Sequence, residues 1–250
     1  MAIVLGGDGI DALLTVGPNI AADGLVFHID PASTDSMITK GGIPLTNGVE
    51  IDYMYGLVGD GQLVTFTGTV GFPYYVADKG GYLYVGANST ENIRGTLSKQ
   101  IVLGNTYTLD IWVSPRRSSN DWGQDWLSGQ DLTPPINAGG RSILVTINGA
   151  GIDTYGYNSL TRAIPRDIWV NATIVVTPVE AAYYINGILR GIGPKTDNRQ
   201  LDIRLQYIGS AVYPQGGGDT SLGPTKAYNR ALTASEILQN HNATKGRYTL

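Results

Sequence analysis

Glu50 and Asp52 are the residues whose types and spacing come nearest to a hydrolytic site in this chain. Side chains two residues apart on a strand point to the same side of a sheet, and retaining glycosidases use two carboxylates about 5–5.5 Å apart. The known arrangement along one strand carries a further carboxylate four residues after the first, where this chain has Met54. We therefore expect a polar strand edge at residues 50–54 and no enzyme activity.

The composition restricts metal and nucleophile chemistry. The chain has 2 His and 0 Cys, so a zinc site of three or four His and Cys ligands cannot be built without carboxylates. His28 lies in an apolar run, and we expect a hydrogen-bonded residue of the core or of a strand edge. His241 falls at the end of a predicted helix, where a positive charge is favourable. Turns at Asp60 and Asp219 are only weak calcium candidates, so we predict no metal and no cofactor.

The strongest binding candidates lie in the segment 114–141, whose length is unusual for a connection without a function. Two tryptophans there stand among polar residues. They could stack on a sugar ring, anchor a contact between subunits, or pack within the loop itself, and the sequence leaves these three roles open. The candidates are Arg116, Arg117, Asp121, Trp122, Gln124, Asp125 and Trp126.

The overall composition is that of a globular chain that is rich in turns. Of its 250 residues, 34 are Gly and 12 are Pro, and charged residues make up only 15%. Lys and Arg number 17 against 21 Asp and Glu, a net charge of −4, which argues against nucleic-acid binding because such proteins need a basic surface. The N-terminus has no positively charged region of a signal peptide, and no apolar run is long enough to span a membrane.

The hydrophobic pattern has a period of two, which is typical of strands. Short β-branched and aromatic runs are bounded by turn residues, and the predicted strands are 25–29, 63–67, 82–85, 107–113, 142–147, 169–176, 182–185, 203–208 and 225–228. Asn186-Gly187 predicts a tight hairpin over 182–191, because both central residues of a type I′ turn need positive φ. Asn148-Gly149 predicts a second hairpin turn.

One helix is predicted near the C-terminus. Thr233 and Glu236 form a capping box, and Leu232 with Ile237 forms a hydrophobic staple around it. The helix should begin after Thr233 and run to about residue 242. We expect no other long element that is not a strand.

The first 20 residues are Gly-rich and irregular, and we predict an extended arm at 1–20 followed by one β-sandwich domain at 21–250. Such an arm could contact a neighbouring subunit through its aliphatic side chains. The predicted contact residues are Ile3, Val4, Leu5, Ile10, Leu13 and Leu14.

Both ends of the chain carry a family resemblance. Residues 17–30, with the run Leu25-Val26-Phe27-His28-Ile29, resemble the opening strand of concanavalin A-like (laminin G-like) jelly-roll domains, in particular those of structural proteins of tailed phages. Residues 227–237 resemble the closing strand and capped helix of that family, and the likeness continues to Tyr248. Residues 33–50, which lack the usual Trp, depart from the family, and 1–16 have no counterpart in it.

The resemblance implies an all-β, two-sheet antiparallel jelly-roll sandwich with one short C-terminal helix and adjacent first and last strands. The resemblance does not fix a function, because this fold hosts lectins, glucanases and structural modules. Together with the lack of Cys and of a catalytic set, the N-terminal arm and the aromatic loop, the phage members of the family lead us to expect a non-enzymatic phage virion protein, a capsid decoration or cement protein. Its partners would be the major capsid protein, other virion subunits and copies of itself, at the capsid surface after synthesis in the host cytoplasm. The alternative is a carbohydrate-binding tail-fibre or receptor-binding adhesin that uses Trp122 and Trp126.

Overall fold

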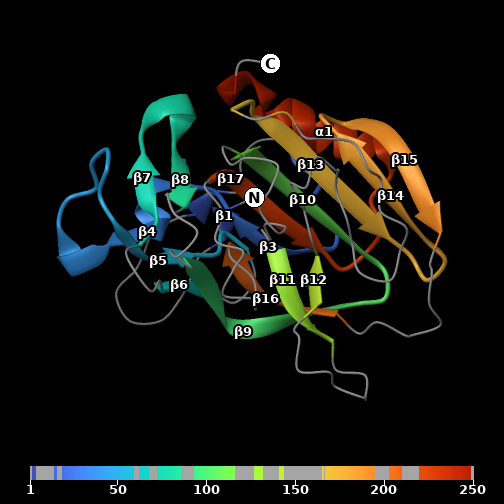
Figure 1. Cartoon of the computed structure of the whole chain (residues 1–250), viewed down its shortest axis with the longest axis horizontal. Coiled ribbons are helices and arrows are strands. Elements are labelled where there is room, and N and C mark those ends of the chain that lie inside the picture. Colours follow the sequence, from blue (N-terminus) through green and yellow to red (C-terminus); the bar gives the residue numbers. More distant parts are fainter. Residues whose placement is uncertain are drawn as a thin grey trace.

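The computed structural model (Figure 1) describes most of the chain. Its described residues are 19–58, 62–67, 72–85, 93–115, 165, 167–194 and 220–248, together with the backbone of the strands at 2–3, 14–15, 127–131, 141–143 and 203–209. The predicted loop candidates from Arg116 to Trp126 and the Asn148-Gly149 turn lie outside this part. Of the helices in the described part, none is long and apolar enough to cross a membrane.

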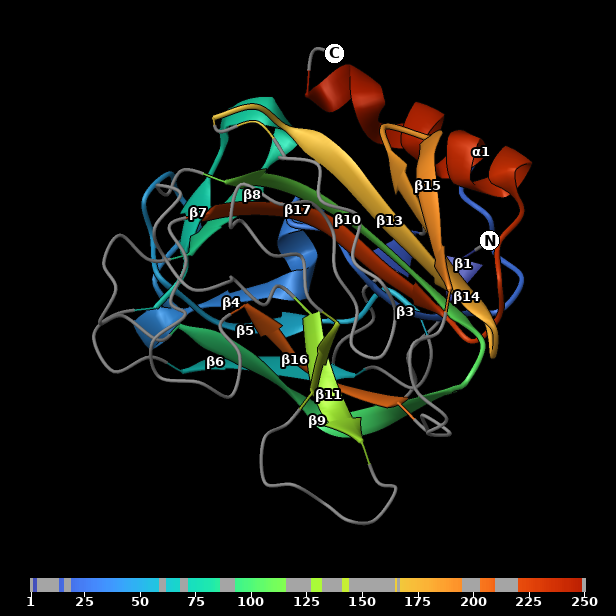
Figure 2. The same cartoon turned by 45° about the vertical axis from the view of Figure 1, so that its right-hand side comes forward.

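Two large antiparallel sheets face one another, as the turned view of Figure 2 shows. The helix-side sheet contains, in spatial order, β15 (Ile188–Pro194), β14 (Glu180–Ile185), β13 (Val170–Val176), β10 (Tyr107–Pro115), β17 (Thr220–Tyr228), β8 (Tyr82–Val85) and β7 (Tyr74–Val76), with β3 (Leu25–Ile29) also paired to β17. The opposite sheet contains β12 (Arg141–Ile143), β11 (Leu127–Asp131), β16 (Ile203–Gly209), β9 (Arg94–Gly104), β6 (Leu63–Thr67), β5 (Ile51–Tyr55) and β4 (Met37–Thr39). Short 3-10 turns η1 (Thr34–Ser36), η2 (Lys40–Gly42) and η3 (Asp78–Gly80) join strands.

The predicted two-sheet sandwich is confirmed, and so is the closeness of its first and last long strands. β3 pairs antiparallel with β17, with His28 opposite Lys226. Along β10, Leu109, Ile111 and Val113 belong to the core between the sheets. The intervening side chains point to the other face of the sheet because strand residues alternate. That face is also buried in β10, since a helix covers it.

Helix α1 (Ala234–Thr244) lies on the outer face of the helix-side sheet (Figure 2) and is followed by the 3-10 turn η4 (Lys245–Arg247). Its predicted capping box is confirmed: the Thr233 side chain accepts from the Glu236 amide, and the Glu236 carboxylate accepts from the Thr233 amide. Leu232 and Ile237 are buried in the same cluster, as the staple requires. The helix ends at Thr244, two residues beyond the predicted end.

The predicted hairpin is confirmed by β14 and β15, which Asn186 and Gly187 connect with φ of 54° and 75°. At the N-terminus, β1 (Ala2–Ile3) and β2 (Leu14–Thr15) pair with one another, and Ile3 lies opposite Leu14. The other predicted arm contacts, Val4, Leu5, Ile10 and Leu13, lie outside the described residues. The division of the chain at residue 20 therefore stays a prediction.

Candidate binding site over the C-terminal helix

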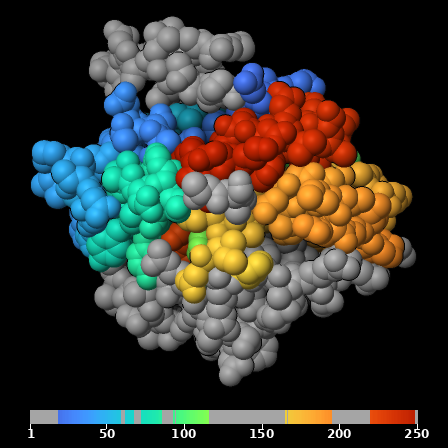
Figure 3. All heavy atoms as spheres, turned by 90° about the horizontal axis from the view of Figure 1, so that it is seen from above, coloured from blue at the N-terminus to red at the C-terminus, as the bar shows by residue number. Residues whose placement is uncertain are grey.

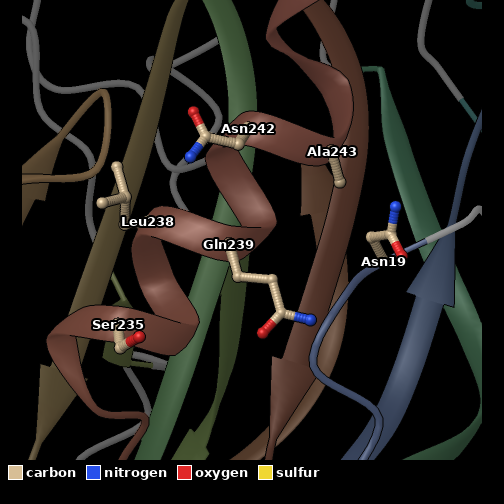
Figure 4. A pocket seen from close by; sticks show the side chains of 6 residues that line it. All are labelled: Asn19, Ser235, Leu238, Gln239, Asn242 and Ala243. Atoms are coloured by element: carbon tan, nitrogen blue, oxygen red, sulfur yellow. The ribbon is translucent and has the colours of Figure 1, made fainter.

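A shallow pocket of about 390 Å³ lies over the outer surface of α1 and extends to Asn19 (Figure 4). Figure 4 shows Gln239 and Ala243 on the side of the helix nearer Asn19, with Ser235, Leu238 and Asn242 on its other side. The lining residues are Asn19, Ser235, Leu238, Gln239, Asn242 and Ala243. None of these six side chains carries a charge.

Most of the pocket lining comes from α1, which has an exposed face and a buried face. Ser235, Leu238 and Asn242 are spaced by three and four residues, so they follow one side of the helix, and all three are exposed. The buried side carries Ile237 and His241, which hold the helix on the sheet. The sequence predicted this helix. It did not predict the pocket, because Asn19 also lines it and helical spacing does not reveal that Asn19 lies beside α1.

Asn240 holds the far wall of the pocket in place. Its Oδ1 accepts from the Ala21 amide at 2.8 Å, and its Nδ2 donates to the Tyr228 hydroxyl oxygen at 2.9 Å. Burial raises the pKa of Tyr228, so that hydroxyl stays neutral. Asn19 itself has a φ of 68°, a left-handed conformation that Asn adopts more readily than most residues. The segment at residues 19–21 is therefore fixed against α1 through one buried amide.

The lining suits a neutral, hydroxylated ligand. Each amide side chain offers both a donor and an acceptor, and the Ser235 hydroxyl offers both as well. Leu238 is 45% exposed and gives the pocket an apolar patch. A charged phosphate or carboxylate ligand would find no opposite charge among the six lining residues.

A buried polar row lies beneath α1, and the sequence analysis missed it. Lys226 and Asp110 are both 0% exposed, and Lys226 Nζ lies 3.1 Å from Asp110 Oδ2. Thr173 Oγ1 donates to Asp110 Oδ1 at 3.3 Å, and Asn171 Nδ2 donates to the same oxygen. The only available signal was one charged residue in each of two apolar strands. Their pairing depends on strand register between residues far apart in sequence.

The structure corrects the expectation for His28 and adds detail to that for His241. His28 is buried in β3 as expected, but neither ring nitrogen has a hydrogen-bond partner within the described part of the chain. Burial, Lys226 and Arg247 lower its pKa well below the ordinary value of 6.5. His241 lies in the last turn of α1 as expected, and burial and Lys245 lower the pKa of its ring, against the favourable effect of the helix end. That ring stacks on Trp112, with centroids 5.4 Å apart.

Glu50 and Asp52 lack the further carboxylate of the glycosidase arrangement, because Met54 stands in its place. Glu50 Oε2 lies 2.8 Å from Lys40 Nζ, whereas the Met54 side chain is 0% exposed within the core between the sheets. Among the described residues, no group of three or more His, Cys, Asp or Glu side chains could hold a metal ion. The weak calcium candidates Asp60 and Asp219 lie outside those residues.

The comparisons with known proteins identify the family. A model of the concanavalin A-like lectin/glucanases superfamily, Laminin_G_3, matches residues 86–238, which is more than half of the chain. The chain belongs to this superfamily. The resemblance to concanavalin A-like domains found in the sequence is thereby confirmed, whereas the phage virion origin stays a prediction. No curated protein matches the sequence of this superfamily member.

Solved structures agree on the fold. Trypanosoma rangeli sialidase with sialic acid is 15% identical at a TM-score of 0.54, over 92% of this chain and 35% of the sialidase. Domain 4 of AbnA, a GH43 extracellular arabinanase from Geobacillus stearothermophilus, in complex with arabinotriose, is 17% identical at 0.55, over 88% and 98%. The binding domain of Paraclostridial Mosquitocidal Protein 1 is 17% identical at 0.50, over 84% and 52%. The superfamily member thus spans about a third of the sialidase.

Proposed function

We propose that this chain is a non-catalytic carbohydrate-binding module that takes a neutral glycan in the pocket over α1. The uncharged amide and hydroxyl lining of that pocket carries the proposal. Sugar hydroxyls donate and accept hydrogen bonds, which Gln239, Asn242 and Ser235 match, and Leu238 offers an apolar contact for a sugar ring face. The pocket is formed on a rigid helix, which limits the ordering cost of binding.

The solved relatives support a binding role over an enzymatic one. The domain of the arabinanase that resembles this chain over 98% of its own length holds arabinotriose. The likeness to the sialidase covers only 35% of that enzyme. Glu50 is engaged by Lys40, which supports the view that the carboxylate pair at Glu50 and Asp52 is a structural feature of the strand edge.

Titration calorimetry with arabinotriose and with the glycans that bind best on an oligosaccharide array tests the proposal. The double variant Gln239→Ala/Asn242→Ala should weaken binding about 5-fold or more, because two hydrogen bonds contribute about 0.5–1.5 kcal/mol each. Asn105→Ala removes an exposed amide far from α1 in sequence and should leave binding unchanged. If Trp122→Ala/Trp126→Ala abolishes binding and the helix variant does not, the glycan site is the predicted loop and not the pocket.

Attachment to a virus particle is a second candidate function, favoured by exposed aliphatic side chains beside α1. Ile188, Leu189 and Ile192 on β15 are 55%, 46% and 50% exposed, and the Leu238 side chain lies close to the turn at Gly187. β15 ends the helix-side sheet among the described strands, and exposed apolar edges favour contacts with other chains. Figure 3 shows the helix (red) beside this hairpin (orange) on one face.

In that role the chain would be a decoration or cement protein at a phage capsid surface. Its partners would be the major capsid protein, other virion subunits or copies of itself. Ile192→Lys should reduce co-sedimentation with purified particles, whereas Ile43→Lys, a similarly exposed aliphatic in the loop after η2, should not. Deleting residues 1–20 should weaken assembly and leave the sandwich folded. Equal co-sedimentation of all four proteins would contradict this second function.

A further inference from the structure

The last described residues, Lys245–Tyr248, fold back onto the helix-side sheet, and we name them the C-terminal clamp. The Arg247 guanidinium forms an ion pair with Asp30, in which Nη1 donates to both carboxylate oxygens, at 2.9 Å to Oδ1 and 2.8 Å to Oδ2. Its Nη2 donates to the Gly81 carbonyl at 3.0 Å, and its Nε to the Lys79 carbonyl at 3.4 Å. One side chain thus joins the end of the chain to β3 and to the turn before β8.

The Tyr248 ring fills a slot between two tryptophans. Its centroid lies 4.4 Å from that of Trp112 and 4.4 Å from that of Trp169. The slot exists because β17 bulges opposite Trp112 and places Gly223 there. A Cβ atom on Gly223 would lie 2.3 Å from the Tyr248 hydroxyl oxygen. All three rings are almost completely buried while the clamp is closed.

His28 lies between the two ion pairs that border this region. In register it stands opposite Lys226, whose Nζ binds Asp110 at 3.1 Å. Asp30, the partner of Arg247, follows two residues along the same chain. His28 is 2% exposed, and within the described residues neither of its ring nitrogens has a hydrogen-bond partner. The imidazole is therefore buried beside two cations without an acceptor of its own.

With His28 neutral, the positive and negative charges of this buried cluster are equal in number. Lys226 and Arg247 contribute two positive charges, and their two carboxylate partners contribute two negative charges. A protonated His28 would add a third positive charge without a hydrogen-bond partner, which a buried site tolerates poorly. Burial, Lys226 and Arg247 accordingly lower the pKa of His28. Tyr228 and Tyr248 add no charge, because burial raises the pKa of each hydroxyl.

Of the two cations beside His28, Arg247 is the freer to move. Lys226 lies inside β17, which pairs with β10 on one side and β3 on the other. Arg247 lies in the 3-10 turn η4, which pairs with no strand of the described part. Repulsion from a protonated imidazole would therefore move Arg247 and leave Lys226 in place.

We propose that the C-terminal clamp opens when the pH falls. Protonation of His28 drives Arg247 away from Asp30, and the Tyr248 ring then leaves the slot between Trp112 and Trp169 while the sandwich stays folded. The open form lets water reach His28, so falling pH favours opening and neutral pH favours the closed clamp. Opening would expose two tryptophans on the outer face of the sheet.

Tryptophan fluorescence reports the state of the slot directly. The chain has 4 Trp, so Trp122→Phe/Trp126→Phe leaves only Trp112 and Trp169, both in the slot. In this background the emission maximum should shift to longer wavelength between about pH 7.5 and about pH 5, the range in which ordinary histidines titrate. The far-UV circular dichroism should stay that of a folded β-sandwich over the same range.

Two variants in the same background test whether His28 senses the pH and whether Arg247 holds the clamp closed. His28→Gln should abolish the pH-dependent shift, and His28→Asn serves if the Gln variant does not fold. Arg247→Gln should show the shifted emission at both pH values. His241→Gln, which alters the other buried imidazole near Trp112, should keep the shift. The proposal is overturned by unchanged emission down to pH 5, by loss of the β signal together with the shift, or by a shift that depends on His241 instead.

Discussion

The buried charge pair of Lys226 and Asp110 explains how polar residues can occupy the sheet face beneath α1. Each oxygen of Asp110 has a donor: Lys226 binds one, and Thr173 and Asn171 bind the other. Removing one partner of such a pair leaves an uncompensated charge in the interior. The stability of this face therefore depends on the pair remaining complete.

We predict that Asp110→Asn lowers the free energy of unfolding by about 3–5 kcal/mol, because it leaves Lys226 charged and unpaired. Urea unfolding followed by circular dichroism measures the change. Glu50→Gln is the matched control, since its ion pair with Lys40 is partly exposed and should contribute about 1 kcal/mol or less. Equal losses for the two variants would show that Asp110 does not neutralise Lys226.

Gly223 should tolerate no side chain while the clamp is closed. A Cβ there would also lie 2.9 Å from the Trp112 Cβ, in addition to its clash with Tyr248. We expect Gly223→Ala to cost about 1–3 kcal/mol, as overpacking of a core does. Gly246→Ala, for which an added Cβ meets nothing within 4 Å, should be close to neutral in the same denaturation experiment. A neutral Gly223→Ala would argue against the packed position of Tyr248.

Among the elements, α1 and the β14–β15 hairpin were predictable because their signals are local. The capping box at Thr233 and Glu236 spans four residues, and the turn at Asn186-Gly187 spans two. The row from His28 through Lys226 to Asp110 was not predictable, because strand register between distant segments creates it. The pocket was missed for the same reason: Asn19 and α1 are more than 200 residues apart in the sequence.

We expect Thr233→Ala to lower stability by about 1 kcal/mol through loss of the helix cap.

Thr233 and Arg230 both bind Glu236, and the Arg230 contact does most to lower the pKa of that carboxylate, to about 2. A lowered pKa stabilises the fold above the unfolded value near 4.5, and this contribution disappears as the pH falls toward 2. Glu236→Gln should therefore lose stability at pH 7 and little at pH 2 in thermal unfolding. A loss that is the same at both pH values would refute this linkage.

At the scale of the whole molecule, two buried neutral histidines should make stability depend on pH. A His pKa that folding lowers gives full stability above the unfolded value near 6.5, and stability falls as the pH drops below it. While the clamp stays closed, the slope from His28 should rise toward about 1.4 kcal/mol per pH unit as the pH falls, and it should level off where the clamp opens, because the folded chain then binds the same proton. Urea unfolding at several pH values between about 7.5 and about 5 should show this slope, and His28→Gln should reduce it. A wild-type curve that is flat over this range would contradict the burial of a neutral imidazole.

The arrangement of layers places the two proposed binding surfaces side by side. One face of α1 is buried against the sheet, and its outer face offers amides to a ligand. The aliphatic side chains of β15 lie beside it and offer contacts to another chain, with Leu238 common to both surfaces. A glycan and a protein partner would therefore compete where they meet Leu238. The sandwich itself serves as the support for both.

The most direct test of the proposed function is a glycan array probed with the intact chain, followed by a reducing-sugar assay on every glycan that binds. We predict binding to at least one neutral oligosaccharide with a Kd between about 1 μM and about 1 mM, and no release of reducing ends during prolonged incubation. A folded chain that binds no glycan on the array would contradict the carbohydrate-binding role. Sustained release of reducing sugar would contradict the non-catalytic one.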